Sequence, residues 1–333
     1  MENTTRNKHR LRTVIIILLV LLFVLYNAAV NVIISAALVP DFMRKLDQFE
    51  KATEQGYAQM VHTDQMTINT QEARKEAQAL VDNVPPQYYA TESKDGYRLI
   101  AAVFRQEDPS EKWVMLLHGY TGWKEEMYHF AARYYEQGWN VICPDMRCQG
   151  SSEGDFIGMG WTDAEDNMIW LSYILSGDPD AKIVLHGESM GAACACMMSG
   201  MELPENVVCV ISDCAYRDVP SIFRKQLKDW FSIPDIGIVR SASFWLQVRG
   251  GYNIYDADTA AQVAKSDIPT FFIHGTEDKF VPPGDALVLY DACSAPKDIM
   301  MIDGAGHAQC SLKDPDMYYA EVFGFIDQHI LEE

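Results

Sequence analysis

Basic residues are scarce in this chain of 333 residues, which has 27 lysines and arginines against 47 aspartates and glutamates. The net charge at pH 7 is −20, so the chain lacks the basic surface that nucleic acids require. Cofactor and metal motifs are missing too: no G-x-G-x-x-G follows an apolar run, and neither G-x-x-x-x-G-K-[ST] nor H-E-x-x-H occurs. We therefore expect no nucleic-acid partner, no cofactor and no catalytic metal.

The eight cysteines form no C-x-x-C pair and show no zinc-type spacing. Several lie in apolar runs, such as Cys209 within residues 207–211. We interpret the cysteines as buried, unpaired thiols that behave as small apolar residues. Several free thiols would be unusual in a domain that faces an oxidising compartment.

Charge is absent from residues 13–39, which begin with an unbroken apolar run at 14–25. The polar interruptions Asn27, Asn31 and Ser35 recur every four residues and share one face of a helix. A helix of this length reaches about 40 Å, enough to cross a hydrocarbon core of roughly 30 Å with some tilt. The segment therefore predicts one transmembrane helix in contact with a lipid bilayer.

Residues 1–12 carry four basic side chains against one acidic side chain, a local charge of +3. This flank predicts a cytoplasmic tail, a single-pass membrane protein and a main domain on the extracytoplasmic side. The alternative is a signal peptide cleaved near the small residues 35–37, which would yield a secreted protein.

Residues 40–86 are mixed in charge and predict a helical connector. From residue 87 to residue 333, short apolar runs alternate with amphipathic segments, which indicates an α/β domain with a mostly parallel central sheet and helices on both faces. The predicted strands are 87–91, 97–104, 113–117, 140–143, 182–186, 207–212, 270–273 and 298–302. The predicted helices are 125–137, 161–175, 189–198 and 317–330.

Residues 213–268 interrupt this alternation because they contain no clear strand. We predict a helical lid inserted over the carboxyl edge of the sheet. Its aromatic residues Phe223, Trp230 and Trp245 are candidates for substrate contact. The alternative is that they only pack the lid onto the core.

The sequence Gly187-Glu188-Ser189-Met190-Gly191 matches G-x-S-x-G, directly after the predicted strand 182–186 and at the start of a helix. A strand, a tight turn and a helix make the elbow that holds a serine nucleophile at the sheet edge. The two glycines permit the strained backbone and the close packing of such a turn.

Ser189 needs a base to accept its proton, and the base needs an acid to orient it. His307 lies in a glycine-rich loop after the last predicted strand, whereas the other histidines precede glycines at strand ends, lie in helices or precede the fold. Asp278 follows the strand 270–273. The predicted catalytic triad is Ser189, Asp278 and His307, in the order Ser, Asp, His.

The oxyanion formed during attack needs backbone N–H donors. We predict Met190, which follows the nucleophile, and Tyr120 in the loop 118–122, with Thr121 as the next candidate in that loop and a residue that could contact substrate. The alternative is that 118–122 is an ordinary glycine-rich turn.

Taken together, residues 87–333 resemble the α/β-hydrolase superfamily. The chain looks most similar to membrane-anchored bacterial serine hydrolases related to acylaminoacyl peptidases and dienelactone-hydrolase-like esterases. The family's nucleophile motif falls on 187–191, its oxyanion loop on 118–122, and a structural D-x-R-x-x-G-x-S turn on 145–152. Cys148 stands in that turn where relatives often have glycine, and the lid matches the place of the family's cap.

The resemblance and the triad predict a serine hydrolase that cleaves a small-molecule ester, thioester or amide through an acyl-enzyme on Ser189. The aromatic lid and the nearby bilayer favour an apolar acyl or aryl ester. One alternative is a serine peptidase like the acylaminoacyl peptidases. Another is a catalytically silent, membrane-bound interaction module. The sequence does not determine the oligomeric state.

Overall fold

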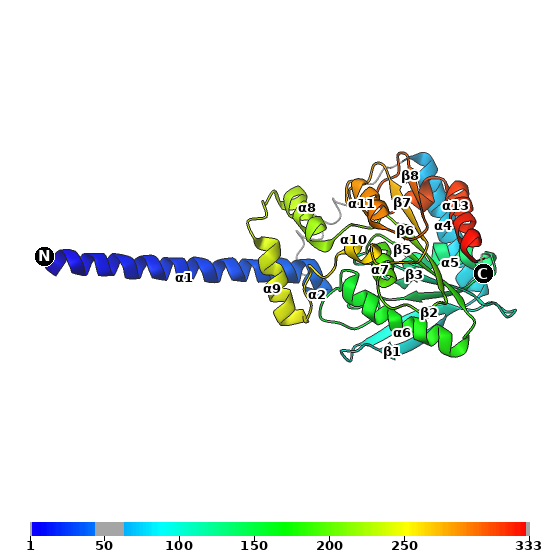
Figure 1. Cartoon of the computed structure of the whole chain (residues 1–333), viewed down its shortest axis with the longest axis horizontal. Coiled ribbons are helices and arrows are strands. Elements are labelled where there is room, and N and C mark those ends of the chain that lie inside the picture. Colours follow the sequence, from blue (N-terminus) through cyan, green and yellow to red (C-terminus); the bar gives the residue numbers. More distant parts are fainter. Residues whose placement is uncertain (1, 44–62, 331–333) are drawn as a thin grey trace.

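The computed structural model of the protein describes residues 2–43 and 63–330, without the side chains of residues 2–8, 41, 43, 230 and 231. An eight-stranded sheet lies at the centre of the body (Figure 1), in the order β1-β2-β4-β3-β5-β6-β7-β8. The strands are β1 (Gln87–Glu92), β2 (Arg98–Phe104), β3 (Lys112–Leu117), β4 (Asn140–Pro144), β5 (Lys182–Glu188), β6 (Val207–Asp213), β7 (Thr270–Gly275) and β8 (Lys297–Ile302).

The first two strands form an antiparallel hairpin, β2 pairs with β4 in antiparallel fashion, and every other pairing is parallel. All residues of β4, β6 and β7 are buried, as expected for parallel strands covered on both faces. The predicted mostly parallel α/β sheet is therefore confirmed.

Two hydrophobic clusters, one on each face, hold helices against the sheet. One face carries α6 (Trp161–Gly177), α7 (Met190–Ser199), α10 (Thr259–Val263) and α11 (Gly284–Ala292). The other carries α4 (Asp64–Asn83), α5 (Tyr128–Glu136) and α13 (Pro315–Ile330), with the short α12 (Cys310–Lys313) beside them. Seven of the eight cysteines are buried, which agrees with the apolar runs around them.

Two elements differ in detail from the prediction. The helix expected at 125–137 is a 3-10 turn, η1 (Lys124–Met127), followed by α5. Within the connector, residues 44–62 lie outside the described part of the chain. Its helix α4 packs against α5 and α12, and Asn69 Nδ2 donates to the carbonyl oxygen of Leu312 at 2.8 Å. Part of the connector is thus built into the globular body.

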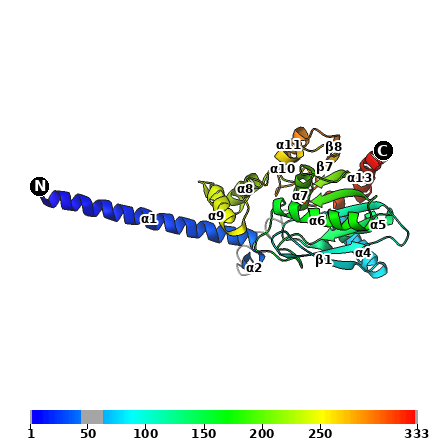
Figure 2. The same cartoon turned by 60° about the horizontal axis from the view of Figure 1, so that its bottom comes forward.

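The long helix α1 (Glu2–Leu38) projects from the body (Figures 1 and 2) and is followed by α2 (Pro40–Met43). Within the described chain, its segment His9–Leu38 is the one helix long and apolar enough to cross a membrane. A membrane anchor and a signal sequence both fit such a helix. The tail predicted as residues 1–12 is helical from residue 2 onward.

The predicted lid region contains α8 (Val219–Phe231) and α9 (Ile238–Gly250), so its helical character agrees with expectation. Both views show α9 beside the end of α1 that enters the body (Figures 1 and 2). The helix α10, also inside 213–268, packs on α7 in the layer next to the sheet.

The polar face of α1 is the face that meets α9. Trp245 Nε1 donates to Asn27 Oδ1 at 2.8 Å, and Arg249 Nη1 lies 3.2 Å from both Asn31 Oδ1 and Ser35 Oγ. The four-residue spacing seen in the sequence therefore reflects a helix–helix contact.

Candidate active site

Ser189 lies between β5 and α7 with φ 56° and ψ −116°, a backbone conformation that non-glycine residues rarely adopt. Its backbone N–H donates to the carbonyl oxygen of Asp213 on the neighbouring strand at 2.8 Å. This bond helps to hold the strained turn, which presents the serine side chain as a nucleophile elbow requires.

The two glycines of the elbow are required by close packing. A Cβ on Gly187 would lie 2.2 Å from the carbonyl carbon of Gly191. A Cβ on Gly191 would lie 1.9 Å from the backbone oxygen of Leu117. Backbone atoms cannot move away cheaply, so any side chain at either position would open the turn.

The structure brings Ser189, His307 and Asp278 together. Ser189 Oγ lies 2.8 Å from His307 Nε2, and His307 Nδ1 lies 2.7 Å from Asp278 Oδ2. All three are buried, with exposed fractions of 6%, 7% and 4%. They come from loops after β5, β8 and β7, so the carboxyl ends of parallel strands converge on one site.

Asp278 is held as a carboxylate by hydrogen bonds on both oxygens. Its Oδ1 accepts from the backbone N–H groups of Phe280 at 2.8 Å and Val281 at 2.9 Å. Burial by itself would raise the pKa of Asp278, but His307 and His274 against Oδ2 outweigh it and hold the pKa well below its usual range. The group is therefore an anion at neutral pH.

His274, at the end of β7, is a second histidine on this carboxylate. Its Nε2 lies 3.2 Å from Asp278 Oδ2 and 3.2 Å from the carbonyl oxygen of Val281. His274 precedes a glycine at a strand end, and its contact with Asp278 was not predicted from the sequence. The signal in the sequence was its position at the end of the strand, four residues before Asp278 in the loop that follows.

Two further histidines are neutral structural groups. The backbone N–H of Met146 donates to His118 Nε2 at 2.9 Å, and burial lowers the pKa of His118 to about 4. His186 lies 3.0 Å from the hydroxyl of Tyr134 and 3.2 Å from that of Tyr318, and burial lowers its pKa to about 3. These contacts hold the ends of β3 and β5 next to the elbow.

The predicted oxyanion loop lies directly beside the nucleophile. A Cβ on Gly119 would be 3.5 Å from the Cβ of Ser189, and Tyr120 is the next residue. Met190 begins α7 on the other side, where a helix N-terminus favours negative charge. Thr121 has φ 59° and donates its hydroxyl to the backbone oxygen of Tyr120 at 2.7 Å, so this hydroxyl is already engaged.

Among the described residues, one group of side chains has metal-ligand geometry: the ligand atoms of Cys214, Asp278 and His307 lie within 4.8 Å of one another. Burial raises the pKa of Cys214 well above its usual value, so the thiol stays protonated, whereas metals bind the thiolate. His307 Nδ1 already faces Asp278. The arrangement suits proton transfer better than metal binding.

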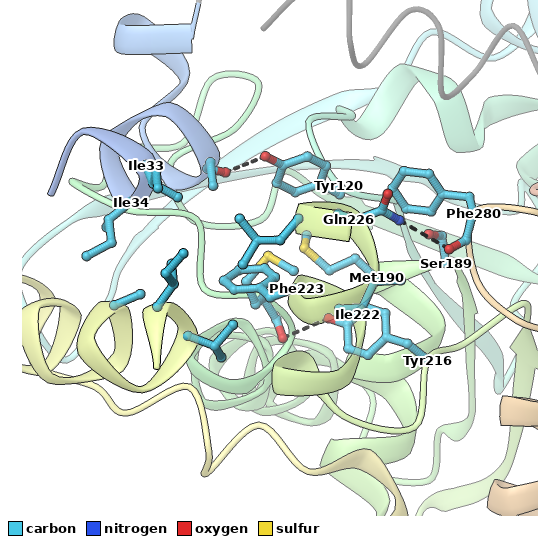
Figure 3. A pocket seen from close by; sticks show the side chains of 16 residues that line it. Ile33, Ile34, Tyr120, Ser189, Met190, Tyr216, Ile222, Phe223, Gln226 and Phe280 are labelled. Carbon is cyan, nitrogen blue, oxygen red and sulfur yellow. Dashed lines mark hydrogen bonds between the residues drawn. The ribbon is translucent and has the colours of Figure 1, made fainter. Parts of the chain in front are cut away.

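A pocket lies in front of Ser189 (Figure 3). None of its sixteen lining residues, all in the described chain, is charged. They are Ile33, Ile34, Ala37, Tyr120, Met159, Ser189, Met190, Tyr216, Ile222, Phe223, Gln226, Leu227, Ile238, Val239, Ala242 and Phe280.

The structure places some of the predicted substrate-contacting residues at the pocket and others away from it. Phe223 lines the pocket, whereas Thr121 and Trp245 are not among the lining residues, and Trp245 contacts α1. The side chain of Trp230 lies outside what the structure describes.

Sequence reasoning missed the contribution of α1, whose residues Ile33, Ile34 and Ala37 line the pocket. It also missed Tyr216 and Phe280. For α1 the polar face at Asn27, Asn31 and Ser35 was a signal that the end of the helix packs against protein.

The family described as alpha/beta hydrolase fold matches residues 112–237 of the chain. The uncharacterized protein YqkD of Bacillus subtilis is 26% identical over 215 residues, which cover 64% of this chain and 70% of that protein.

Solved structures are similar over most of the chain. An esterase from Pyrococcus furiosus has a TM-score of 0.61 and 20% identity, and the match covers 74% of this chain and 92% of the esterase. An acylaminoacyl peptidase from Pyrococcus horikoshii has a TM-score of 0.58 and 16% identity over 74% of this chain and 42% of the peptidase. Likenesses at these identities show a shared fold.

Proposed function

The chain has the α/β-hydrolase fold, as the sequence predicted, and on that premise we propose that it is a serine hydrolase acting through an acyl-enzyme on Ser189. The observation that carries the proposal is the continuous hydrogen-bonded path from Ser189 Oγ through His307 to Asp278, with distances of 2.8 Å and 2.7 Å. This path begins at the strained elbow. Backbone strain is typical of functional positions, so Ser189 is the expected nucleophile.

In this mechanism Ser189 Oγ attacks the carbonyl carbon of the substrate while His307 Nε2 accepts the hydroxyl proton. Asp278 keeps His307 in the required tautomer and stabilises the imidazolium. The backbone N–H groups of Met190 and Tyr120 receive the developing oxyanion. His307 then passes the proton to the leaving group, and a water molecule releases the acyl group by the same steps.

The charge-free pocket favours an ester or thioester with an apolar acyl group. A peptidase of the acylaminoacyl type is the alternative that the fold leaves open. It would need polar contacts for a peptide, and the only polar side chains among the described pocket residues are Ser189, Gln226 and two tyrosines. Both tyrosine hydroxyls already donate to backbone oxygens, Tyr120 to Ala37 and Tyr216 to Met159.

The helix α1 acts in this proposal as an uncleaved, single-pass membrane anchor. Cleavage near residues 35–37 would remove Ile33 and Ile34 from the pocket wall. It would also break the bonds of Asn27 and Asn31 to α9. The basic flank at residues 1–12 supports an extracytoplasmic position for the catalytic domain.

Labelling with a fluorophosphonate tests the serine nucleophile. The full chain in detergent micelles should react, and Ser189→Ala should not. The exposed Ser151 provides a matched control, because Ser151→Ala should label at the wild-type rate. A wild-type chain that stays unlabelled would instead support a catalytically silent module.

A further inference from the structure

The pocket in front of Ser189 is closed partly by the helix that is apolar enough to cross a bilayer. Ile33, Ile34 and Ala37 share one face of α1 and line the pocket. Figure 3 shows Ile33 and Ile34 at the end of the pocket away from Ser189. The pocket therefore runs from the nucleophile to the membrane-type helix.

Directional bonds place α1 in this position. The hydroxyl of Tyr120 donates to the backbone oxygen of Ala37, and the backbone N–H of Ile157 donates to that of Leu38 at 2.9 Å. Together with the bonds to α9 described above, they join α1 to the oxyanion loop, to the lid region and to the segment before α6. The end of α1 is thus a fixed wall of the pocket.

The depth of α1 in a bilayer follows from its exposed length. The side chains of residues 13–25 are all exposed, and they extend over about 20 Å of helix. A hydrocarbon core of roughly 30 Å needs about seven further residues. Those are residues 26–32, and Tyr26, Asn27 and Asn31 in this stretch bond side chains of α9. This places α9 level with the outer part of the bilayer, at the boundary between acyl chains and headgroups.

The lid region exposes large apolar side chains, which such a position favours. Phe244 and Val248 on α9 are 59% and 61% exposed, and Ile236 just before α9 is 75% exposed. Large apolar side chains at these exposures can insert into the headgroup and acyl boundary of a bilayer. We define Ile236, Phe244 and Val248 as the outer apolar patch.

From these observations we propose that the pocket binds the acyl chain of a membrane-resident acyl ester, with the chain against α1 and the ester carbonyl at Ser189. The proposal rests on the proposed serine hydrolase function and names its substrate class. Sixteen uncharged lining residues suit an alkyl chain, and the position of α9 puts the pocket next to the bilayer.

The reaction balances without any co-reactant except water. A bond forms between Ser189 Oγ and the carbonyl carbon, the ester C–O bond breaks, and the alcohol leaves with the proton carried by His307. Water then cleaves the acyl-enzyme and yields the carboxylic acid and the free serine.

The first experiment measures chain-length preference with the full chain in phosphatidylcholine vesicles. The probes are para-nitrophenyl butanoate and para-nitrophenyl dodecanoate. Ala37→Leu adds bulk to the pocket wall and should lower kcat/KM for the dodecanoate about 10-fold, while the butanoate stays within about 2-fold. Ala29→Leu, at an exposed position on the same helix, is the matched control and should change neither value.

Equal losses on both esters with Ala37→Leu, or no loss on either, would overturn the assignment of α1 as an acyl-chain wall. If this variant does not fold, Ile33→Ala replaces it. Removing that contact should slow the dodecanoate about 3-fold or more and leave the butanoate unchanged.

Labelling of Ser189 by fluorophosphonate tests the serine hydrolase function separately from the substrate class. An unlabelled wild-type chain contradicts the proposed function itself. A labelled chain whose α1 variants do not distinguish the two esters contradicts only the inference about α1.

Variants of the outer apolar patch test whether the ester enters the pocket from the bilayer or from solution. The double variant Phe244→Ser and Val248→Ser should slow hydrolysis of dodecanoate dissolved in vesicles about 5-fold and leave dodecanoate presented on soluble cyclodextrin unchanged. Leu287→Ser with Val288→Ser, on exposed positions of α11, is the matched control. Equal slowing in both presentations, or in neither, would show that the ester does not enter from the bilayer.

Discussion

The two ends of the pocket are built from different interactions. At the Ser189 end, buried polar groups come from loops after β5, β7 and β8, and short hydrogen bonds connect them. At the α1 end, aliphatic side chains from α1, α8 and α9 meet without hydrogen bonds between those side chains. Hydrogen bonds are directional and costly to leave unpaired, whereas apolar contact is not directional. We therefore expect abrupt losses at the first end and graded changes at the second.

The largest effect is expected at the Ser189 end. Asp278→Asn should lower kcat about 10⁴-fold with the fold intact, because an amide cannot hold His307 in the productive tautomer. Ester hydrolysis measures the loss of kcat, and thermal unfolding measures whether the fold is intact. Asp303→Asn, an exposed carboxylate close to His307 in sequence, should lower kcat less than about 3-fold. A small decrease in kcat with Asp278→Asn would contradict the expected difference between the two ends of the pocket.

The neutral histidines of the Ser189 end should make the protein sensitive to acid. His118 has a pKa of about 4 when folded and about 6.5 when unfolded, so the unfolded chain binds the proton first as the pH falls. Its contribution to stability is complete above pH ~6.5 and is lost by pH ~4, about 3 kcal/mol in all. In urea unfolding across this range, the free energy of unfolding should change less steeply with pH for His118→Asn than for the wild type. His186, whose pKa is also lowered, should still contribute to the remaining slope. An unchanged slope would contradict this assignment.

His274 tests whether the second histidine on Asp278 positions the triad. His274→Asn should lower kcat about 10-fold to 100-fold with little change in KM, because a hydrogen bond to a buried carboxylate is lost. The pH profile of kcat should also shift, since His307 would then be the remaining histidine partner of that carboxylate. His329→Asn on α13 is the control. A variant with normal kcat and pH profile would show that His274 serves the fold alone.

The smallest effect is expected between α1 and α9. Asn27→Ala and Trp245→Phe each remove one partner of the bond at 2.8 Å, and a double-mutant cycle on urea unfolding should give a coupling energy of about 1 kcal/mol. Asn27→Ala combined with Phe244→Leu should be additive, because the exposed Phe244 is not a partner in that bond. A coupling energy near zero would show that this bond does not help to hold α1 against α9.

The predictable parts of the site are local. The strand, turn and helix around Ser189 are contiguous, and the clash that a side chain at Gly187 or Gly191 would cause involves the same turn and its neighbouring strand. The loops with Asp278 and His307 could be assigned because parallel strands end at one edge of the sheet. Cys148 has a φ of 62°, a left-handed conformation that favours glycine, which agrees with the glycine that the family resemblance led us to expect at this position.

The lid region was predictable as helical, but its contacts were not. Trp245 is as apolar and aromatic as a substrate contact would be, yet its indole bonds Asn27, some 218 residues earlier in the chain. Likewise α4 reads as a connector, while Leu80 is buried in the core cluster beside α5. The sequence shows that a side chain is apolar. It does not show which of several apolar surfaces that side chain packs against.

The sequence by itself determined the α/β alternation, the elbow, the order of the three polar residues and the apolar length of α1, because each depends on neighbouring residues or on the period of one element. Only the tertiary structure decided that His274 joins Asp278 and that Ile33, Ile34 and Ala37 form the far wall of the pocket. The physical reason is that lipid, protein core and a pocket for an alkyl chain all accept the same apolar side chains. The three environments are distinguished only by which helices lie side by side.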